Sequence, residues 1–371
     1  MRTPPLAAPP MQRETRVAAR ILVTGVAGFL GAHVAAALVQ AGFEVVGIDN
    51  LCTGDRQTLA RLQHLCGERL AIERSDLREP APVLRALARH KPAAVLHLAL
   101  LPPDAATPIA YYDNHVHGLT TLLAAMSACN VHTLVMGSSG ALYGARLRGL
   151  RTEPADEHEA IAPQGPHGHT LAACEQLLGD LGAADRRWRI GVLRVFQPLG
   201  AHESGLIGDF APGARHVMAR ALDVATGRSP RVMLGGGTWP TADGTRAVDV
   251  VHVSDVAQGF LRALEALARG TGSFTANLGR GAAATELQLL GALERVCRRA
   301  LPFELGPAAA AGATPAGLAV RVADVRRAAT LLGWRAQHDL ERICRDAWRA
   351  RRLNRRGFSE QPAAAPSPAA L

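Results

Sequence analysis

The chain has 371 residues and a formal net charge of +9, with 48% hydrophobic and only 4% aromatic residues. This length suffices for one large domain or two, with ample sequence to bury a core. The six cysteines are scattered without a C-x-x-C pair, so we interpret them as reduced thiols of a cytoplasmic protein. No apolar run is long enough to span a bilayer, which argues against an integral membrane protein.

The positive charge does not indicate a nucleic-acid-binding surface. All basic side chains other than Lys91 are arginines, and they are spread through the chain. The densest group, within residues 345–356, lies at a predicted helix C-terminus, where cations suit the helix dipole. We therefore expect a solvated basic helix end, with neither nucleic acid nor a membrane as partner. The Pro- and Ala-rich segments 1–18 and 353–371 are predicted to be disordered tails.

The first distinctive stretch covers residues 20–31. An apolar run typical of a buried strand ends at a turn, and residues 33–39 have the composition of a helix that packs on a sheet. Gly25, Gly28 and Gly31 are spaced three apart through this turn. One glycine permits the tight turn, one lets backbone N–H groups approach a pyrophosphate, and one lets helix and strand pack closely. The pattern predicts a dinucleotide site, against the alternative of a glycine-rich turn without ligand.

Acidic residues follow the next two predicted strands. Asp49 ends the strand at 44–48, where a carboxylate can accept hydrogen bonds from a ribose diol and would repel a 2′-phosphate. This favours NAD over NADP. Asp76 ends the strand at 70–76 and could contact adenine, or it could be the N-cap of the next helix.

The rest of the chain continues to alternate between strand and helix. Further strands are predicted at 93–99, 132–139 and 189–196, with helices between them. This order predicts an α/β protein with a Rossmann-type doubly wound parallel sheet, covered on both faces, and a smaller C-terminal α/β region. We expect the first domain to span 19–198 and the substrate-binding region 199–352, with 249–268 returning to the first domain.

Several motifs, in order, then identify a resemblance. They are Thr24-Gly25 with Gly28 and Gly31, Asp49 to Cys52, Tyr111 to Asn114, Ser138-Ser139 with Tyr143-Gly144, and Leu193 to Phe196. Later segments agree, namely 200–205, 239–245, 249–255 and 277–279. From about residue 20 to 348 the chain resembles the extended short-chain dehydrogenase/reductases, and within them the UDP-glucose 4-epimerase family.

The resemblance implies inversion at C4 of a UDP-hexose. A tightly held NAD would take hydride from C4, and hydride would return to the other face of the keto sugar. It also implies a set of cofactor contacts from the strand ends and the glycine turn. These are Gly25, Gly28, Phe29, Leu30, Gly31, Asp49, Asn50, Asp76, Leu77, Leu98, Ala99, Asn114 and Phe196.

The catalytic positions depart from the family. The family has a tyrosine base and, four residues later on the same helical face, a lysine that lowers its pKa and holds the nicotinamide ribose. These positions are His167 and Leu171 here, whereas the serine at the end of the fifth strand is kept as Ser139. A neutral His167 could accept a proton, but Leu171 can neither tune a base nor hold a ribose. We expect weak or lost activity.

The substrate side departs as well. Gln197 replaces the family's asparagine after the sixth strand, Val248 replaces an arginine, and the loop 306–312 contains no cation. Because a UDP-sugar carries two negative charges that arginines usually meet, Arg215, Arg231 or Arg246 would have to substitute.

Two further features complete the sequence-based expectations. His158, His167 and His169 are close in sequence but lack ligand spacing with a carboxylate or thiol, so no metal is expected. The apolar stripe of 113–128, with 172–181, corresponds to the family's dimer helices, although core packing explains part of it. A homodimer is expected. The alternatives to a weakened epimerase are a non-catalytic NAD-binding scaffold or regulator, and a nucleotide-sugar enzyme of altered chemistry that uses His167.

Overall fold

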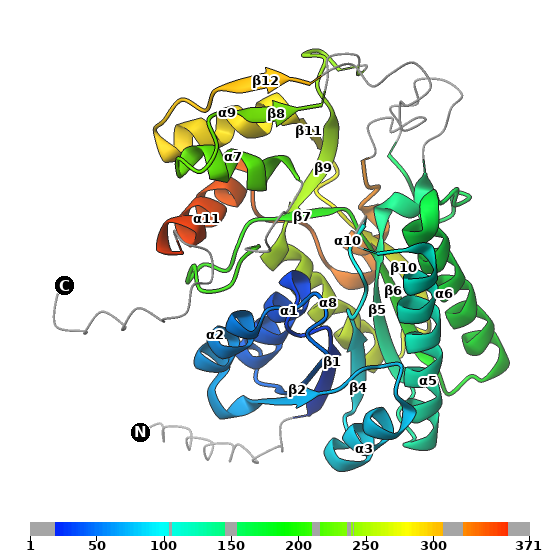
Figure 1. Cartoon of the computed structure of the whole chain (residues 1–371). Coiled ribbons are helices and arrows are strands. Elements are labelled where there is room, and N and C mark those ends of the chain that lie inside the picture. Colours follow the sequence, from blue (N-terminus) through cyan, green and yellow to red (C-terminus); the bar gives the residue numbers. More distant parts are fainter. Residues whose placement is uncertain are drawn as a thin grey trace, which may run out of the picture.

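The structure is a computed structural model that describes residues 19–103, 106–144, 154–209, 216–235, 239, 241–306 and 322–354. A seven-stranded sheet lies at its centre, with strand order β10-β6-β5-β4-β1-β2-β3 (Figure 1). All neighbouring strands are parallel. The strands are β1 (Arg20–Thr24), β2 (Glu44–Asp49), β3 (Leu70–Arg74), β4 (Ala94–His97), β5 (Thr133–Ser139), β6 (Arg189–Val195) and β10 (Phe274–Leu278). The strand order reverses between β1 and β4, which confirms the predicted doubly wound fold.

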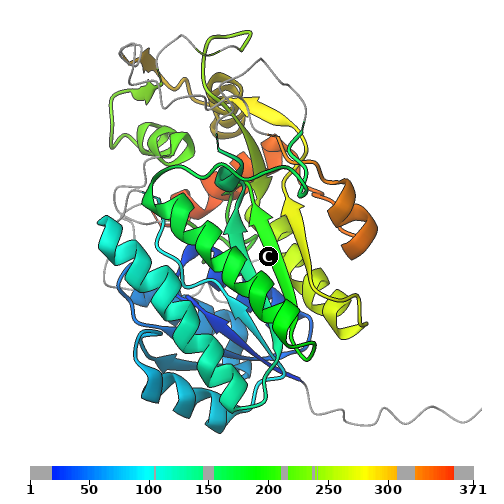
Figure 2. The same cartoon turned by 90° about the vertical axis from the view of Figure 1, so that its right-hand side faces the viewer.

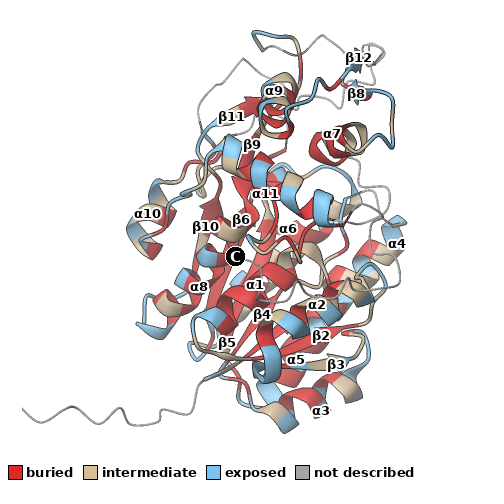
Figure 3. Cartoon of the chain, turned by 90° about the vertical axis from the view of Figure 1, so that its left-hand side faces the viewer, coloured by how far each residue is buried: buried red, intermediate tan, exposed pale blue. Residues whose placement is uncertain are grey.

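Helices cover both faces of this sheet, as Figures 1 and 2 show. One face carries α1 (Phe29–Gln40), α2 (Arg56–Cys66) and α8 (Val253–Ala268), and the other α3 (Pro80–His90), α5 (Gly118–Ala128) and α6 (Gly165–Ala184). Alternate strand residues enter the two cores: Ile21 and Val23 join one apolar cluster, and Leu22 joins the other. Figure 3 shows the sheet buried between these layers.

A smaller α/β region lies beyond the carboxyl ends of β5 and β6 (Figure 1). Its strands form a three-stranded sheet and a two-stranded sheet. They are β7 (Gln197–Leu199), β9 (Ala247–His252) and β11 (Ala283–Thr285) in the first, with β8 (Val232–Leu234) and β12 (Phe303–Leu305) in the second. Its helices are α7 (Val217–Ala225), α9 (Glu286–Cys297) and α11 (Leu340–Leu353). The fold class predicted from the sequence, with its smaller C-terminal region, is therefore confirmed.

The chain returns from this region to the main sheet twice. After β9, which pairs with β7 and β11, α8 packs against α1. The strand β10 then joins the edge of the large sheet beside β6, and α10 (Arg326–Leu332) packs near it. The sequence analysis assigned only 249–268 to this return, so β10 is an addition that it did not predict.

The C-terminal end differs from the expectation within the described residues. The predicted N-terminal tail lies outside the described residues, as does the C-terminal tail beyond residue 354. Leu353, however, ends α11, and buried Asn354 donates from Nδ2 to the carbonyl oxygens of Gly205, at 3.1 Å, and Ala350, at 2.7 Å. Nor is the basic helix end wholly solvated. Arg351 is buried and pairs with Asp223 at 3.0 Å, because its side chain points inward from α11.

A buried polar network joins β5, α6, β6 and β10. Arg194 pairs with Glu175, with an Nη2–Oε2 distance of 2.7 Å, and both side chains are at most 10% exposed. Ser138 Oγ donates to Glu175 Oε1 at 2.6 Å, and Arg194 Nη1 donates to the Tyr143 hydroxyl at 3.0 Å. Tyr143 in turn donates to Asn277 Oδ1 at 2.7 Å, and burial raises the pKa of Tyr143 to about 12. Tyr143 is therefore a neutral donor that holds β10 to the sheet.

Arg194→Met is expected to destabilise the fold by about 3–5 kcal/mol, because it leaves the Glu175 carboxylate buried without its cation. The double variant Arg194→Met with Glu175→Met should recover part of this loss, since neither charge then remains. Chemical denaturation measures both. Arg345→Met is the matched control: its ion pair with Glu341 is exposed, so about 0.5 kcal/mol or less is expected. An Arg194 variant as mild as this control would contradict the assigned role.

Candidate functional site

The turn between β1 and α1 accepts only glycine at two positions. Gly25 has φ +72°, and a Cβ there would lie 2.6 Å from the Leu98 carbonyl oxygen. A Cβ on Gly31 would lie 2.0 Å from the Gly25 oxygen. Gly28 is the extended N-cap of α1. Because the first N–H groups of a helix have no partner within it, this turn presents donors and the positive end of a helix dipole to an anion.

The turn is also tied to the end of β4. Thr24 Oγ1 accepts from the backbone N–H of Leu98 at 3.1 Å and of Ala99 at 3.2 Å. Its single hydrogen is therefore donated to Nδ1 of His97, 2.9 Å away. Burial lowers the pKa of His97 to about 3, so the ring is neutral. This arrangement keeps the ends of β1 and β4 in register beside the turn.

A cavity lies beside this turn at the carboxyl ends of β1 to β4. Nine of the thirteen sequence-predicted cofactor residues line it: Gly25, Gly28, Asp49, Asn50, Asp76, Leu77, Leu98, Ala99 and Asn114. The sequence analysis did not name Ser75 and Gly54, which also line it. A Cβ on Gly54 would lie 3.0 Å from Asp49 Oδ1, so a glycine five residues after an acidic strand end was a usable signal.

Polar atoms in this cavity are arranged for a ligand. Asp49 Oδ2 accepts from the Ala27 N–H at 2.8 Å, and Oδ1 accepts from Leu51 at 2.8 Å. Burial raises the pKa of Asp49, and these two bonds oppose that shift. Each carboxylate oxygen keeps a lone pair for a further donor. Ser75 Oγ and Asn114 Oδ1 are buried atoms without a partner among the described residues. Since buried polar atoms are almost always paired, both are suited to contact a bound molecule.

The Asp76 carboxylate is already occupied. Arg78 contacts both of its oxygens, at 2.7 and 2.9 Å, and Asn50 Nδ2 donates at 2.8 Å. The Arg78 guanidinium is the main reason that the pKa of Asp76 is well below its usual range. Asp76 thus forms part of the cavity wall. The N-cap alternative does not apply, because Glu79 precedes α3.

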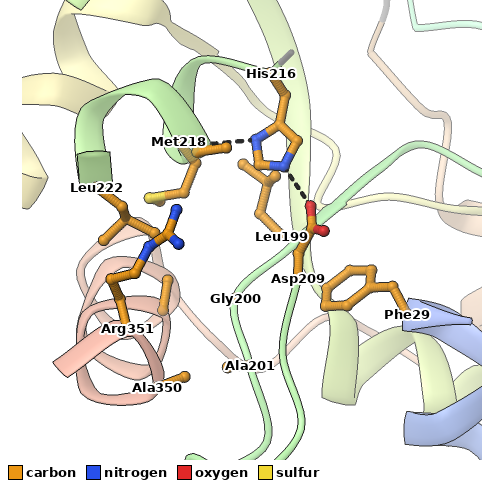
Figure 4. A pocket seen from close by; sticks show the side chains of 12 residues that line it. Phe29, Leu199, Gly200, Ala201, Asp209, His216, Met218, Leu222, Ala350 and Arg351 are labelled. Carbon is orange, nitrogen blue, oxygen red and sulfur yellow. Dashed lines mark hydrogen bonds and ion pairs between the residues drawn. The ribbon is translucent and has the colours of Figure 1, made fainter. Parts of the chain in front are cut away.

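Four predicted cofactor residues do not line this cavity. Leu30 packs against the core and Gly31 against the turn, while Phe196 packs on Tyr143 with ring centroids 6.3 Å apart. The Phe29 ring lies edge-to-face with His33 and lines a second cavity, which Figure 4 shows together with Asp209, His216 and Arg351. Residues 29–31 can therefore contribute backbone N–H groups to an anion but not side chains.

The predicted catalytic positions lie at the ends of β5 and α6. Ser139 Oγ accepts from the Ala141 N–H at 3.1 Å. His167 is in the first turn of α6, with its ring edge-to-face against Tyr111 and His115, at centroid distances of 5.8 and 5.7 Å. One turn further, Leu171 is 2% exposed and belongs to the apolar cluster beneath the helix. Hydrocarbon packing therefore surrounds residue 171, the position at which the resemblance predicts a lysine in the family.

His115 beside these positions is also neutral. Its Nε2 accepts from the Leu101 N–H at 2.9 Å, so the proton is on Nδ1, which donates to Thr170 Oγ1 at 2.8 Å. Thr170 passes its own hydrogen to the Pro166 carbonyl at 2.9 Å. Burial lowers the pKa of His115 to about 4. The ring is thus a structural link between α6 and the loop after β4.

Two of the predicted substrate residues, Gln197 and Arg231, lie on or next to strands of different sheets. Gln197 begins β7 and pairs with Val250, whereas Arg231 forms an exposed ion pair with Glu304 at 2.7 Å. Arg215 and most of the loop 306–312 lie outside the described residues. Val248 packs against the apolar core of the smaller region.

Fold and site together define a Rossmann-type protein with a glycine turn beside a cavity at the carboxyl ends of the strands. A family model described as the NAD dependent epimerase/dehydratase family matches residues 21–279, and the chain belongs to this family. No helix among the described residues has the length and apolar character needed to cross a membrane.

Two curated relatives are UDP-glucose 4-epimerases. The one from Bacillus subtilis is 34% identical over 91% of this chain and 98% of its own. The one from Neisseria meningitidis serogroup C is also 34% identical, over 92% and 99%.

Two solved structures are similar over most of the chain. The UDP-glucose-4-epimerase from Stenotrophomonas maltophila, with bound NAD and formylated UDP-arabinopyranose, has a TM-score of 0.85 at 35% identity, covering 91% of this chain and 99% of that one. The enzyme from Bifidobacterium longum in complex with NAD+ and UDP has a TM-score of 0.83 at 30% identity, covering 91% and 100%.

Proposed function

We propose that this chain binds NAD(H) as a member of the UDP-glucose 4-epimerase type, with epimerase activity that is weak or lost. The observation that carries the NAD proposal is the glycine turn beside a cavity that holds Asp49 and the unpaired atoms of Ser75 and Asn114. Asp49 would hold the adenine ribose, and the N–H groups of residues 29–31 would meet the pyrophosphate. The solved relatives with bound NAD support the same ligand.

The proposed loss of activity rests on α6. When bound, NAD supplies a hydride acceptor, and epimerisation also needs a base for the 4-hydroxyl. Ser139 could hydrogen-bond the reacting oxygen, but Leu171 offers no cation to a base or a ribose. His167 as a substitute base in altered nucleotide-sugar chemistry is the second candidate. The packing of its ring between Tyr111 and His115 weighs against that use. A UDP-hexose therefore remains a possible ligand, with Gln197 and Arg215 as candidate contacts.

Two further proposals concern the location of the chain and its assembly. We propose a cytoplasmic location, which the six free cysteines favour. We also propose a homodimer through α5 and α6, as the family resemblance implies. Part of the expected apolar stripe is already used within one chain, because Leu119, Leu122 and Met126 are buried in its core.

Gly28→Val is expected to abolish NAD binding, because its side chain would enter the space beside the Gly25 oxygen, which a Cβ at residue 28 already approaches to 3.2 Å. Titration calorimetry of wild type and variant with NAD+ and NADH measures this. Gly291→Val on α9 is the matched control, since only the Arg295 guanidinium lies within 4 Å of its Cβ position. A wild-type protein that binds neither NAD+ nor NADH would overturn the proposal.

Interconversion of UDP-glucose and UDP-galactose is expected to be several orders of magnitude slower than in the Bacillus subtilis relative, measured by a coupled assay. Each tenfold loss corresponds to about 1.4 kcal/mol of barrier, and base and cation are absent together. His167→Tyr with Leu171→Lys should restore little, since Val248 and the loop 306–312 also lack the family's arginines.

Turnover near about 1 per second by the wild-type chain would contradict the proposed loss of activity, because that rate is ordinary for enzymes. If His167→Ala then abolished this turnover, the imidazole would be the substitute base.

Sedimentation equilibrium at micromolar protein is expected to give the mass of two chains. Asp180→Arg on the exposed face of α6 should shift the mass toward one chain, whereas Arg345→Glu on α11 should leave it unchanged. A wild-type mass of one chain would refute the dimer.

A further inference from the structure

The site at the carboxyl ends of the strands has two halves, which differ in the polar groups that they offer to a ligand. A dinucleotide on a doubly wound sheet places one nucleoside over β1 to β3 and the other beyond the strand-order reversal, over β4 to β6. The first half holds Asp49, the unpaired Ser75 Oγ and Asn114 Oδ1, and the glycine turn. Several described residues of the second half use polar atoms for bonds within the protein, namely His115, Thr170, Glu175 and Arg194.

We infer that this site recognises the ADP-ribose part of a dinucleotide. The group attached to the distal ribose then adds little to the affinity. This inference rests on the proposed NAD site and specifies what that site recognises. ADP-ribose, NAD+ and NADH are then ligands of nearly equal affinity, whereas a 2′-phosphorylated nucleotide is excluded by Asp49.

The first argument concerns hydrogen bonds in the second half. His115 uses both ring nitrogens within the protein, to the Leu101 N–H and to Thr170. Leu171 is enclosed by apolar side chains and has no polar atom to offer. A hydrogen bond from a charged group is worth about 1.5–3 kcal/mol, which is roughly a 10- to 150-fold gain in affinity. Without such a donor on α6, the nicotinamide riboside contributes little.

The second argument concerns charge. The oxidised nicotinamide ring is a cation and the reduced ring is neutral, so an unpaired charge nearby would separate their affinities. One charged pair of this half, Glu175 and Arg194, is buried and mutually neutralised, with Arg194 contacting both carboxylate oxygens. His97 and His115 are neutral because burial lowers the pKa of each, to about 3 and about 4. These groups do not distinguish the two redox forms.

The experiment is calorimetry on the full chain, freed of co-purified nucleotide, with NAD+, NADH, ADP-ribose, ADP and NADP+. We expect the dissociation constants of NAD+, NADH and ADP-ribose to agree within about threefold, and NADP+ to bind at least about tenfold more weakly. Ser75→Ala and Asn114→Ala should weaken NAD+ and ADP-ribose by the same factor. Ser139→Ala and His167→Ala, in the other half, should change neither by more than about threefold.

The outcomes distinguish this inference from the proposed NAD site on which it rests. NAD+ binding more than about tenfold tighter than ADP-ribose would refute the inference and leave the NAD site standing. The same holds if Ser139→Ala or His167→Ala weakened NAD+ but not ADP-ribose. Failure of all five nucleotides to bind would overturn the NAD site itself. Circular dichroism of each variant ensures that a lost affinity is not a lost fold.

Discussion

The turn between β1 and α1 lies so close to β2 and β4 that it constrains the carboxyl end of the central sheet. Gly25 donates its N–H to the Ile48 carbonyl of β2 at 2.8 Å, while its Cα faces the end of β4 without room for a Cβ. Gly31 then brings α1 down onto the same turn. Because β1 lies between β2 and β4 where the strand order reverses, this turn fixes where both halves of a crevice begin. The backbone geometry of the turn therefore sets the position of the cavity beside it, independently of the side chains that line the cavity.

Side chains then make the two halves of that crevice different. Around the Asp49 side, polar atoms point toward open space or lack partners within the described chain. On the α6 side, Thr170 and His115 satisfy each other, and Leu171 adds to the core. An enzyme that handles a charged transition state needs polar groups aimed at the reacting atoms, and preorganised groups supply much of the rate. Here the polar groups of Thr170 and Glu175 on α6 are hydrogen-bonded within the protein, which supports the proposed loss of epimerase activity.

Much of the fold was predictable because the signals were local. Six of the seven central strands were predicted from short apolar runs, and the glycine spacing identified the turn. The family resemblance implied nine of the residues that line the cavity. The strand β10 was missed because polar Thr275 and Asn277 interrupt it, and it depends on the distant partner Tyr143. The ion pairs of Asp76 with Arg78 and of Arg231 with Glu304 were likewise not predictable, since both depend on the folded geometry. Periodicity could not distinguish core from dimer contact for Leu122, because both bury the same helical face.

The proposed loss of catalysis need not weaken this fold, because the buried ion pair of α6 does not involve residues 167 and 171. Glu175 lies on α6 one turn beyond Leu171, and there it binds Arg194 and Ser138 across two strands. Removing one partner of such a buried pair is costly, so these residues are constrained by stability. At Leu171, by contrast, stability favours an apolar side chain over a charged one. A buried lysine would lose hydration without a carboxylate partner, whereas leucine fills the same volume with apolar contacts. Packing in this chain therefore favours leucine at residue 171.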